Sequence, residues 1–421
     1  MPSHPHPLRS RSFRLLFAGR TLSLLGDAVV PAALALAVLQ ATGSTSALAL
    51  VLACAMVPKL LLLPLGGVAG DRFDARRIAL ATDLVRCATQ LLVGAQLLSS
   101  EPRLWVVAGA EVIGGTASAF AMPTVSPLIT GTVTDDQLQR ANAAMGVALS
   151  AARLGGPALA GLLVLTSGPG WAFVLDGASF AVSAALLAAV RVRNVRVPRR
   201  SLFTDLREGW SEVRSRDWYW TSLIAHAAWN GAAAVLMTLG PAIAVRGPGG
   251  EGAWVAMLQT GAVGLLVGSL LAGHARPRRP VLAANLGLAT YALPLLLMAA
   301  SAPMPLTIAA YGVAQAGLGF LSPVWSTAVQ RAFPAHALAR VTSYDWLLSL
   351  AAVPLGYALA PVAASAWGAH VPLTVAALAV GGACLATAAA PGVRRLHAQR
   401  DEEDDYGAGG RSKNVSSATV A

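Results

Sequence analysis

The sequence predicts an all-α membrane protein with twelve transmembrane helices in two six-helix halves. Three observations predict this fold class. Of the 421 residues, 55% are hydrophobic and only 12% are charged, about half of the roughly 25% charged residues usual in soluble domains. Twelve apolar stretches are each long enough to cross a bilayer. The basic residues are concentrated in every second connection between those stretches.

A bilayer-spanning helix needs about 20 mostly apolar residues. The first stretch, 13–40, follows a polar and basic start and exceeds the roughly 7–15 residues of a signal-peptide core, so we interpret it as a retained helix. The expected spans are 13–40, 45–69, 78–99, 104–124, 141–165, 170–190, 218–245, 252–274, 281–301, 305–330, 339–365 and 371–390.

The distribution of basic residues predicts the orientation of these spans. With the N-terminus inside, 25 of the 31 lysines and arginines lie in cytoplasmic segments, and the outer loops carry only Arg103 and Arg246. Cytoplasmic loops of membrane proteins carry such an excess. We therefore expect a multi-pass protein of the plasma (inner) membrane with both termini in the cytoplasm. The net charge of +11 is interpreted as a topology signal, and nucleic acid is not an expected partner.

The longest polar connection divides the chain. Its second part, Leu202-Phe203-x-x-Leu206-x-x-x-Trp210-x-x-Val213, has helical apolar spacing and predicts an amphipathic helix at the membrane surface. The expected segments are a cytoplasmic tail (1–12), an N-terminal bundle (13–190), a linker with the amphipathic helix (191–217), a C-terminal bundle (218–390) and a disordered cytoplasmic tail (391–421).

The two halves also share a sequence repeat. Pro123 precedes Arg140 by seventeen residues, and Pro323 precedes Arg340 by the same number. The glycine and arginines that follow the second span recur weakly after Gly268. Several coincidences at an offset of 200 or 201 predict an internal repeat of six helices, a common plan of secondary transporters.

Motifs for other kinds of chemistry are absent from the sequence. It contains no Walker A motif, no convincing dinucleotide fingerprint and no HExxH motif. The three cysteines, in apolar stretches, lack the spacing of a metal or disulfide framework. We therefore expect no catalytic residue, no cofactor and no metal, and transport driven by an ion gradient or by the substrate alone.

The most specific motif lies between spans two and three. It reads Gly67-x-x-x-Asp71-Arg72-x-x-x-Arg76-Arg77 and resembles the loop signature of the major facilitator superfamily. Two positions depart from that signature: Asp74 replaces a glycine and Ala75 a basic residue. A carboxylate beside arginines at the membrane boundary can form charge-assisted bonds that hold one conformation. The motif thus predicts a gate; alternatively, its arginines only set the topology.

Span five contains Gly155-Gly156-Pro157-Ala-Leu-Ala160-Gly161, which resembles a partial form of a glycine-proline element of facilitator antiporters. Small residues such as Gly156 and Gly161 let helices approach closely, and Pro157 permits a bend. Helix packing alone explains the pattern equally well.

The fuller pattern resembles the drug:proton antiporter branch that includes macrolide and siderophore exporters. The resemblance rests on Ser23-Leu-Leu-Gly-Asp27, Arg140-Ala-Asn142 and Leu175-Asp176-Gly-Ala-Ser179-Phe180, and it covers about residues 10–390. It implies a monomer with the major facilitator fold that exports small amphipathic compounds by proton antiport. The alternatives are an importer or uniporter of a small nutrient and, from another class, a membrane enzyme or sensor.

Four charged residues within the spans are candidates for proton coupling: Asp27, Lys59, Glu111 and Arg153. At about 1.5 Å per residue, Asp27, Glu111 and Arg153 lie at nearly one level, with Lys59 nearer the cytoplasm. We expect Asp27 or Glu111 to carry the proton, with Arg153 as its counter-charge, because a carboxylate binds a proton less readily beside an arginine. A static ion-pair cluster is the alternative.

Other polar residues of the spans receive less specific roles. Asp83, Arg86 and Asp176 are interpreted as residues near span ends that pair between helices, and Asp345 as a partner of the basic segment near Arg331 or Arg340. Around the central cavity that the family fold implies, the candidates for substrate contact are Trp229, Asn230, Gln315, Trp325 and Tyr344.

Overall fold

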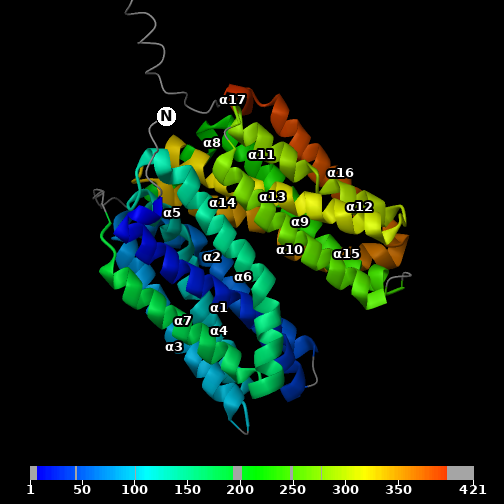
Figure 1. Cartoon of the computed structure of the whole chain (residues 1–421), viewed down its shortest axis with the longest axis horizontal. Coiled ribbons are helices and arrows are strands. Elements are labelled where there is room, and N and C mark those ends of the chain that lie inside the picture. Colours follow the sequence, from blue (N-terminus) through cyan, green and yellow to red (C-terminus); the bar gives the residue numbers. More distant parts are fainter. Residues whose placement is uncertain are drawn as a thin grey trace, which may run out of the picture.

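The computed structural model describes residues 7–42, 45–99, 101–192, 202–246, 250–275 and 277–395. Its helices, labelled in Figure 1, are η1 (Pro7–Arg9), α1 (Arg11–Thr42), α2 (Thr45–Arg72), α3 (Ala75–Leu98), α4 (Leu104–Ala121), η2 (Met122–Thr124), α5 (Val125–Thr130), η3 (Asp135–Gln137), α6 (Leu138–Ser167), α7 (Gly170–Ala189), α8 (Leu202–Ser215), α9 (Asp217–Arg246), α10 (Gly250–His274), α11 (Pro280–Ala289), α12 (Ala292–Ala299), α13 (Met304–Ala332), α14 (Leu338–Leu350), α15 (Ala352–Trp367), α16 (His370–Ala386), η4 (Thr387–Ala389) and α17 (Pro391–Arg395).

The twelve expected spans are confirmed. Twelve stretches of the described residues are long and apolar enough to cross a membrane. Three contain more than one α-helix: α4 continues through η2 into α5, α11 is followed by α12, and α14 by α15. Large apolar side chains lie exposed on the outside, such as Leu165 at 88% and Leu61 at 71%. Such a surface suits lipid, which does not oppose apolar exposure.

The pseudo-symmetry of the two halves is also confirmed. Helices α6 and α14 begin at Leu138 and Leu338, and α7 and α16 begin at Gly170 and His370, in each case 200 residues apart. Gly168 and Gly368, again 200 apart, end α6 and α15 with φ of 94° and 81°. Glycine adopts this backbone region at little cost. The fifth and eleventh spans therefore end by the same device.

Each half has its own hydrophobic core. One cluster of buried residues lies within 213–393, and two others lie within 29–173 and 13–190. Small residues bring the helices of each core close together. A Cβ atom added to Gly264 would lie 2.0 Å from Gly312 O, and one added to Gly268 would lie 2.0 Å from Ala316 O. Helices α10 and α13 therefore touch backbone to backbone.

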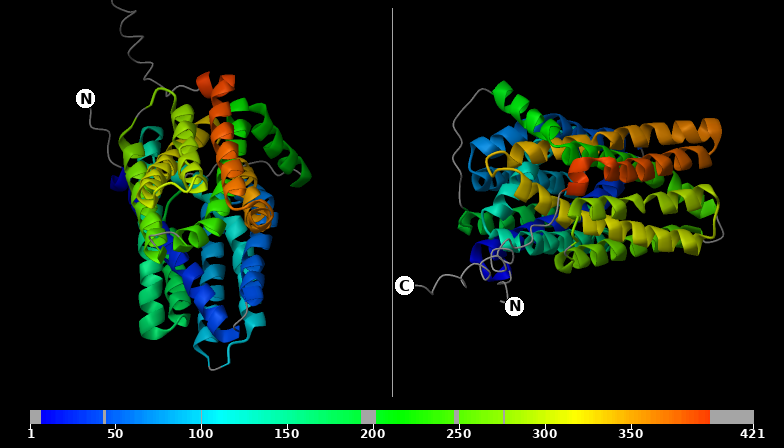
Figure 2. Two further views of the ribbon diagram at one scale, coloured as in Figure 1. Left: turned by 90° about the vertical axis from the view of Figure 1, so that its right-hand side faces the viewer. Right: turned by 90° about the horizontal axis from the view of Figure 1, so that it is seen from above.

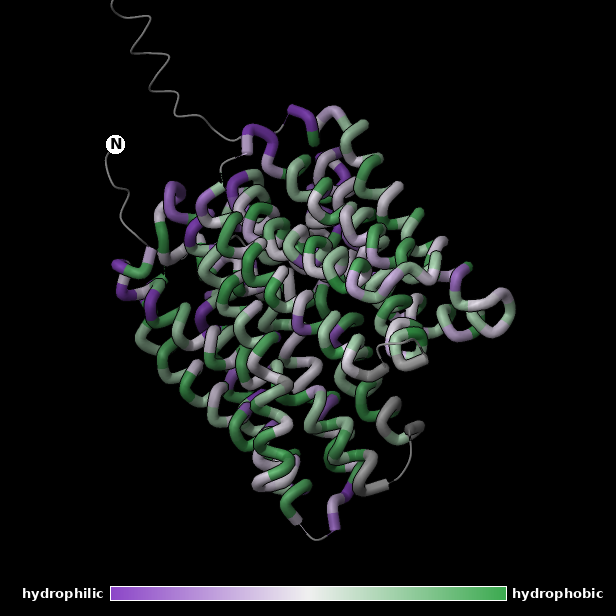
Figure 3. The backbone as a smooth tube through the Cα atoms, turned by 45° about the vertical axis from the view of Figure 1, so that its right-hand side comes forward, coloured by the Kyte–Doolittle hydropathy of each residue, from purple (hydrophilic) through white to green (hydrophobic). Residues whose placement is uncertain are grey.

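The two halves meet at one end of the molecule and diverge from it (Figure 1). At this end α3, α6, α9, α11 and α14 begin, and we call it the basic end because the arginines of the connections gather there. Hydrophilic residues lie mainly at this end (Figure 3). Helices α2 and α6 of the N-terminal half pack here on α10, α13 and α14 of the C-terminal half. Which side of the membrane this end faces stays a prediction.

Helix α8 lies in the segment between the halves and projects from the side of the bundle (Figure 2). The division of the chain into segments is not decided by these contacts and stays a prediction. Half of the expected N-terminal tail (1–6), part of the linker (193–201) and most of the C-terminal tail (396–421) lie outside the described residues.

The glycine contacts between α10 and α13 give a first prediction. Gly268→Ala places a methyl group against Ala316 O, so the two helices must separate, and overpacking of this kind costs about 1–3 kcal/mol. We expect a lower midpoint of thermal unfolding in detergent. Gly252→Ala, on the same helix, is the matched control because no heavy atom lies within 4 Å of its added Cβ. Equal midpoints for the two variants would contradict this packing.

Candidate functional site

The strongest contact between the halves is made by Asp71, the last residue but one of α2. Its carboxylate oxygens accept hydrogen bonds from the backbone N–H groups of Ala339 (2.9 Å) and Arg340 (3.3 Å) in the first turn of α14. Its Oδ2 also lies 2.6 Å from Arg340 Nε. The side chains are only 3% and 7% exposed. A helix N-terminus and a guanidinium both favour an anion, so Asp71 joins α2 firmly to α14.

Further polar contacts extend this junction along α6. Gln139 Nε2 donates to the carbonyl oxygens of Ala272 (2.7 Å) and Ala275 (2.6 Å) at the end of α10. Asn142 Nδ2 donates to Gln330 Oε1 (2.6 Å) and Thr327 Oγ1 (3.0 Å) on α13. These bonds join one turn of α6 to the end of α10 and to α13 at the basic end.

The other members of the predicted gating motif have separate positions. Gly67 packs on α14, because an added Cβ would lie 2.2 Å from Ser343 Oγ. Arg76 stays within its own half and donates through Nη1 to Val190 O at the end of α7 (2.9 Å). Arg77 is exposed and Arg72 is half-buried. Within the motif, Gly67 and Asp71 thus contact the other half, whereas Arg76 holds α3 to α7.

A second charged site lies within the N-terminal half. Asp27 on α1 forms an ion pair with Arg86 on α3. The Arg86 side chain is 13% exposed and its guanidinium lies 4.0 Å from the ring centroid of Phe180 on α7, whereas the Asp27 side chain is 38% exposed. The pair therefore has one buried partner and one partner with access to its surroundings.

Three more carboxylates surround Arg86. Asp176 on α7 is fully buried and interacts electrostatically with Asp27, Arg86 and Glu111. Asp83 is also fully buried and accepts a hydrogen bond from Ser183 Oγ (2.7 Å). An added Cβ at Gly26 would lie 2.2 Å from Asp176 Oδ1, so only glycine allows α1 and α7 this close. We call Asp27, Asp83, Arg86, Glu111 and Asp176 the Arg86 cluster.

The structure changes the expected pairing of the intramembrane charges. Asp27 pairs with Arg86 rather than with Arg153. Lys59 lies within electrostatic range of Asp27 and Arg86, and Glu111 within range of Arg86. Arg153 on α6 is exposed and interacts electrostatically with Tyr311 of the other half. Arg86 lies near the middle of α3 rather than near its inner end, and the expected pairing between helices is made by Arg86 with Asp27 of α1 and by Asp83 with Ser183 of α7.

The glycine-proline element of span five lies against α1. An added Cβ at Gly156 would lie 2.5 Å from Ala28 Cβ, next to Asp27, whereas an added Cβ at Gly161 meets no atom within 4 Å. Helix α6 continues through Pro157, whose side chain lies outside the described residues. Gly156 is therefore the member of this element that sets a helix contact.

The predicted substrate contacts separate into two groups. The Trp229 ring centroid lies 5.2 Å from that of Tyr291, and Gln315 Nε2 donates to Tyr311 OH (2.8 Å). Asn230 Nδ2 donates to His226 O within the same helix (2.9 Å). Among the described residues, Trp229 Nε1 and Gln315 Oε1 are buried without a hydrogen-bond partner. Trp229 and Gln315 thus lie near the aromatic pair Tyr291 and Tyr311, with one free donor and one free acceptor.

Trp325 and Tyr344 are placed elsewhere. Trp325 is 7% exposed, stacks on Tyr219 at 5.2 Å between ring centroids and donates from Nε1 to Asp345 Oδ2 (2.6 Å). Tyr344 OH donates to Leu206 O of α8 (2.9 Å). Both side chains therefore serve contacts within the C-terminal half and with α8.

Asp345 itself does not take the expected cationic partner. Its carboxylate accepts hydrogen bonds from Trp325 Nε1, from Ser349 Oγ (3.1 Å) and from Tyr219 OH (3.5 Å). Arg340, on the same helix, is occupied by Asp71 and by Glu208 of α8 (3.3 Å). Asp345 is a buried acid within a span, which sequence reasoning could identify by its position but not by its partners.

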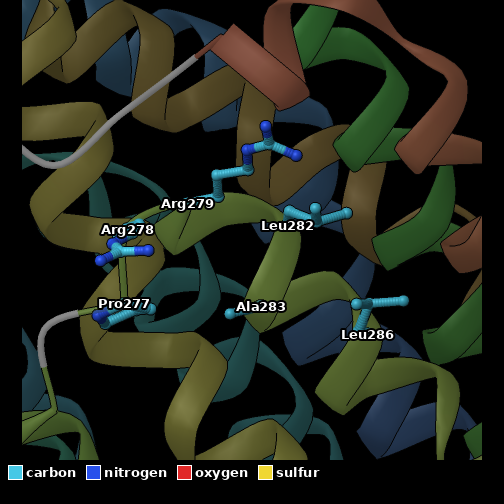
Figure 4. Close-up of a pocket in the computed structure, with 6 residues that line it drawn as sticks. All are labelled: Pro277, Arg278, Arg279, Leu282, Ala283 and Leu286. Carbon is cyan, nitrogen blue, oxygen red and sulfur yellow. The ribbon is translucent and has the colours of Figure 1, made fainter.

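Two surface pockets lie near the basic end. One, of about 430 Å³, lies at the start of α11 and is lined by Pro277, Arg278, Arg279, Leu282, Ala283 and Leu286 (Figure 4). The other, of about 470 Å³, lies between α8 and α9. Neither pocket includes the candidate substrate contacts.

Most of the chain matches a known family of membrane proteins. The sequence profile of the Major Facilitator Superfamily matches residues 16–346. The chain belongs to this superfamily. It is therefore a multi-pass membrane transporter of small-molecule substrates rather than an enzyme, and its fold class is as expected.

Several curated relatives of the transporter are efflux proteins. It is 25% identical over 374 residues to the multidrug efflux pump Tap of Mycolicibacterium fortuitum, covering 85% of this chain and 90% of the relative. It is 22% identical over 271 residues to macrolide efflux protein A of Streptococcus pyogenes, covering 62% and 66%. The expected resemblance to a drug-efflux branch is confirmed at this level.

A solved structure shows the same fold. A bacterial homologue of the iron transporter ferroportin, in an outward-facing state, superposes with a TM-score of 0.73 at 17% identity. The alignment covers 90% of this transporter and 98% of that chain.

The Asp71 contact gives a second prediction. Asp71→Asn removes the charge that Arg340 and the start of α14 bind, and breaking a buried ion pair costs about 3–5 kcal/mol. We expect the basic end to open more often. The measurement is the rate at which a water-soluble maleimide labels Ala143→Cys, a buried interface position, in nanodiscs, with the three native cysteines replaced by alanine.

Asp74→Asn is the matched control for this test. Asp74 caps α3 by accepting a hydrogen bond from Arg76 N (2.9 Å), and asparagine caps helices equally well. We expect several-fold faster labelling with Asp71→Asn and the unchanged rate with Asp74→Asn. Unchanged labelling in both variants would show that Asp71 does not hold this end closed.

Proposed function

We propose that the transporter exports small amphipathic compounds by proton antiport, with each half moving largely as a rigid body around a central site. The observation that carries this proposal is the Asp27–Arg86 ion pair, a titratable carboxylate and its counter-charge on α1 and α3, two helices that both pack against α7 inside the membrane. Full-length similarity to a multidrug efflux pump supports the direction and the cargo class.

Proton coupling follows from the chemistry of the Arg86 cluster. A carboxylate paired with a guanidinium stays ionised, and the same carboxylate binds a proton when the pair separates in a medium of low dielectric. Glu111 and Asp176 lie within electrostatic range of Arg86 and compete for it. If a movement of α1 against α3 changes which acid Arg86 neutralises, proton uptake becomes coupled to conformation. Arg86 therefore has the role of counter-charge that the sequence analysis assigned to Arg153.

The arrangement in the membrane is part of the proposal. The excess of arginines assigns the basic end to the cytoplasm, with both termini there and the protein in the plasma membrane. The Asp71–Arg340 contact then acts as a cytoplasmic gate, and its closure leaves the divergent side facing outward. The unit is proposed to be a monomer, because each half already contributes to the central site.

The proposed cargo contacts are Trp229 and Gln315 with their aromatic neighbours Tyr291 and Tyr311, and Arg153 from the opposite half. Aromatic faces with a few polar groups suit bulky compounds that carry both apolar and polar parts. Macrolide-like or siderophore-like compounds fit this description.

Direction and energy source are tested in one experiment. Antibiotic susceptibility and dye accumulation are measured in an efflux-deficient host, with and without a protonophore, followed by uptake into membrane vesicles. Export predicts proton-driven accumulation in inverted vesicles. Accumulation only in right-side-out vesicles would instead indicate an importer, and transport that ignores the proton gradient would indicate a uniporter.

The proton carrier gives a third prediction. Asp27→Asn leaves Arg86 without its ion-pair partner, so the double variant Asp27→Asn/Arg86→Gln is used to remove both members of the pair and leave the net charge of the cluster unchanged. We expect the double variant to fold and exchange cargo in counterflow, but to lose proton-driven accumulation in inverted vesicles. Glu111→Gln is measured separately, because either acid can carry the proton.

Arg103→Gln is the control, since Arg103 lies at the opposite end of the N-terminal half from the Asp71 contact. It should leave both activities unchanged. Recovery of full proton-driven accumulation in both the double variant and Glu111→Gln would exclude these acids as proton carriers and favour a static packing role for the cluster.

A further inference from the structure

A groove of about 470 Å³ lies where α8 meets the first turns of α9. Trp210, Val213 and Arg214 of α8 line one side, and Trp220, Leu223, Ile224 and Ala227 of α9, with Leu348 of α14, line the other. The contributing residues of α9 lie one turn apart and so form one continuous apolar wall. Figure 2 shows α8 standing at the side of the bundle.

The groove continues the surface that faces lipid. Trp220 is 41% exposed and Ile224 is 55% exposed, and both lie in the span Asp217–Ala244. Trp210 is 40% exposed on the opposite wall. Tryptophan is favoured where hydrocarbon meets the polar surface of a membrane. The walls thus extend from the apolar part of the span to its polar end.

The polar end of the groove carries positive charge. Arg207, Trp210 and Arg214 are spaced by three and four residues, so they share one face of α8, and both arginines are exposed. Glu208 pairs with Arg340 (3.3 Å) and Glu212 pairs with Arg216 (2.5 Å), whereas the side chain of the third acid of α8, Asp205, lies outside the described residues. Arg216 in turn lies over the Phe333 ring. Among the described side chains of α8, the charge on the groove side is therefore that of Arg207 and Arg214.

We propose that this groove binds an anionic phospholipid, with its acyl chain on the α9 wall and its phosphate at Arg207 and Arg214. A free phosphate would leave the apolar wall bare, and a soluble protein partner would have to enter the bilayer to cover Ile224. A phospholipid matches the apolar wall, the tryptophans and the arginines together. Basic pockets beside transmembrane helices commonly bind anionic headgroups in this way.

The bound lipid has a structural consequence for α8. This helix contacts α14 through Tyr344 and through the Glu208–Arg340 pair. A headgroup held by Arg207 and Arg214 fixes the outer face of α8 while these contacts fix its inner face. The lipid thereby stabilises α8, the helix that carries Glu208, which is the second acidic partner of Arg340.

The test uses the full chain in nanodiscs that contain trace amounts of photoactivatable phosphatidylglycerol in phosphatidylcholine. Crosslinked peptides are mapped by mass spectrometry. We expect phosphatidylglycerol to label α8 and the start of α9 more strongly than a phosphatidylcholine probe with the same chains. Since each basic residue near an anionic headgroup contributes about 1 kcal/mol, Arg207→Gln/Arg214→Gln should weaken binding about 30-fold.

Two further variants make the test specific. Arg278→Gln/Arg279→Gln removes two exposed arginines from the other pocket at the same end of the molecule (Figure 4) and should leave labelling of α8 unchanged. Ala227→Trp fills the apolar wall without changing the charge and should reduce labelling by both lipids. Equal labelling by the two probes in the unmodified protein, or unchanged labelling in Arg207→Gln/Arg214→Gln, would overturn the proposal. The readout is lipid binding, so it is independent of cargo and transport direction.

Discussion

The carboxylate of Asp71 has to be neutralised where it lies, because it is buried at the point where α2 reaches α14. A buried charge is tolerated only when hydrogen bonds and an opposite charge replace water. The first turn of α14 supplies two N–H groups and Arg340 supplies the guanidinium. The closed arrangement of the two halves depends on this replacement. When the halves separate at this end, water has to take over the same role.

The same constraint shapes the interior of the N-terminal half, with a different outcome. The carboxylates near Arg86 (Asp27, Asp83, Glu111 and Asp176) outnumber the cationic groups within electrostatic range of them (Arg20, Lys59 and Arg86), so the cluster is not neutral when every acid is ionised. At Asp71 one carboxylate meets one guanidinium, and the charges balance. The excess of acid in the Arg86 cluster is the property on which the proposed proton coupling rests.

The number, order and approximate ends of the spans were predictable from the sequence, because long apolar stretches have few alternatives in a bilayer. The pairing of charges was not. Span three begins at Ala75 rather than near residue 78, which places Arg86 about 16 Å along α3 instead of near its end. Helix α1 is apolar on all sides, so hydropathy does not indicate which way Asp27 faces. The partners of Trp325 and Tyr344 were not predictable for the same reason, since level in the membrane can be counted but rotation cannot.

The backbone contacts between α10 and α13 have a consequence for genetics. Gly264 and Gly268 leave no space for even one methyl group, although neither residue belongs to the proposed cargo or proton sites. In a population screened for loss of transport, changes at these positions would lower the amount of folded transporter and give the same phenotype as changes in the cargo site. Measuring the amount of transporter in the membrane distinguishes the variants that fold poorly from those that alter the cargo site, whereas loss of transport alone does not.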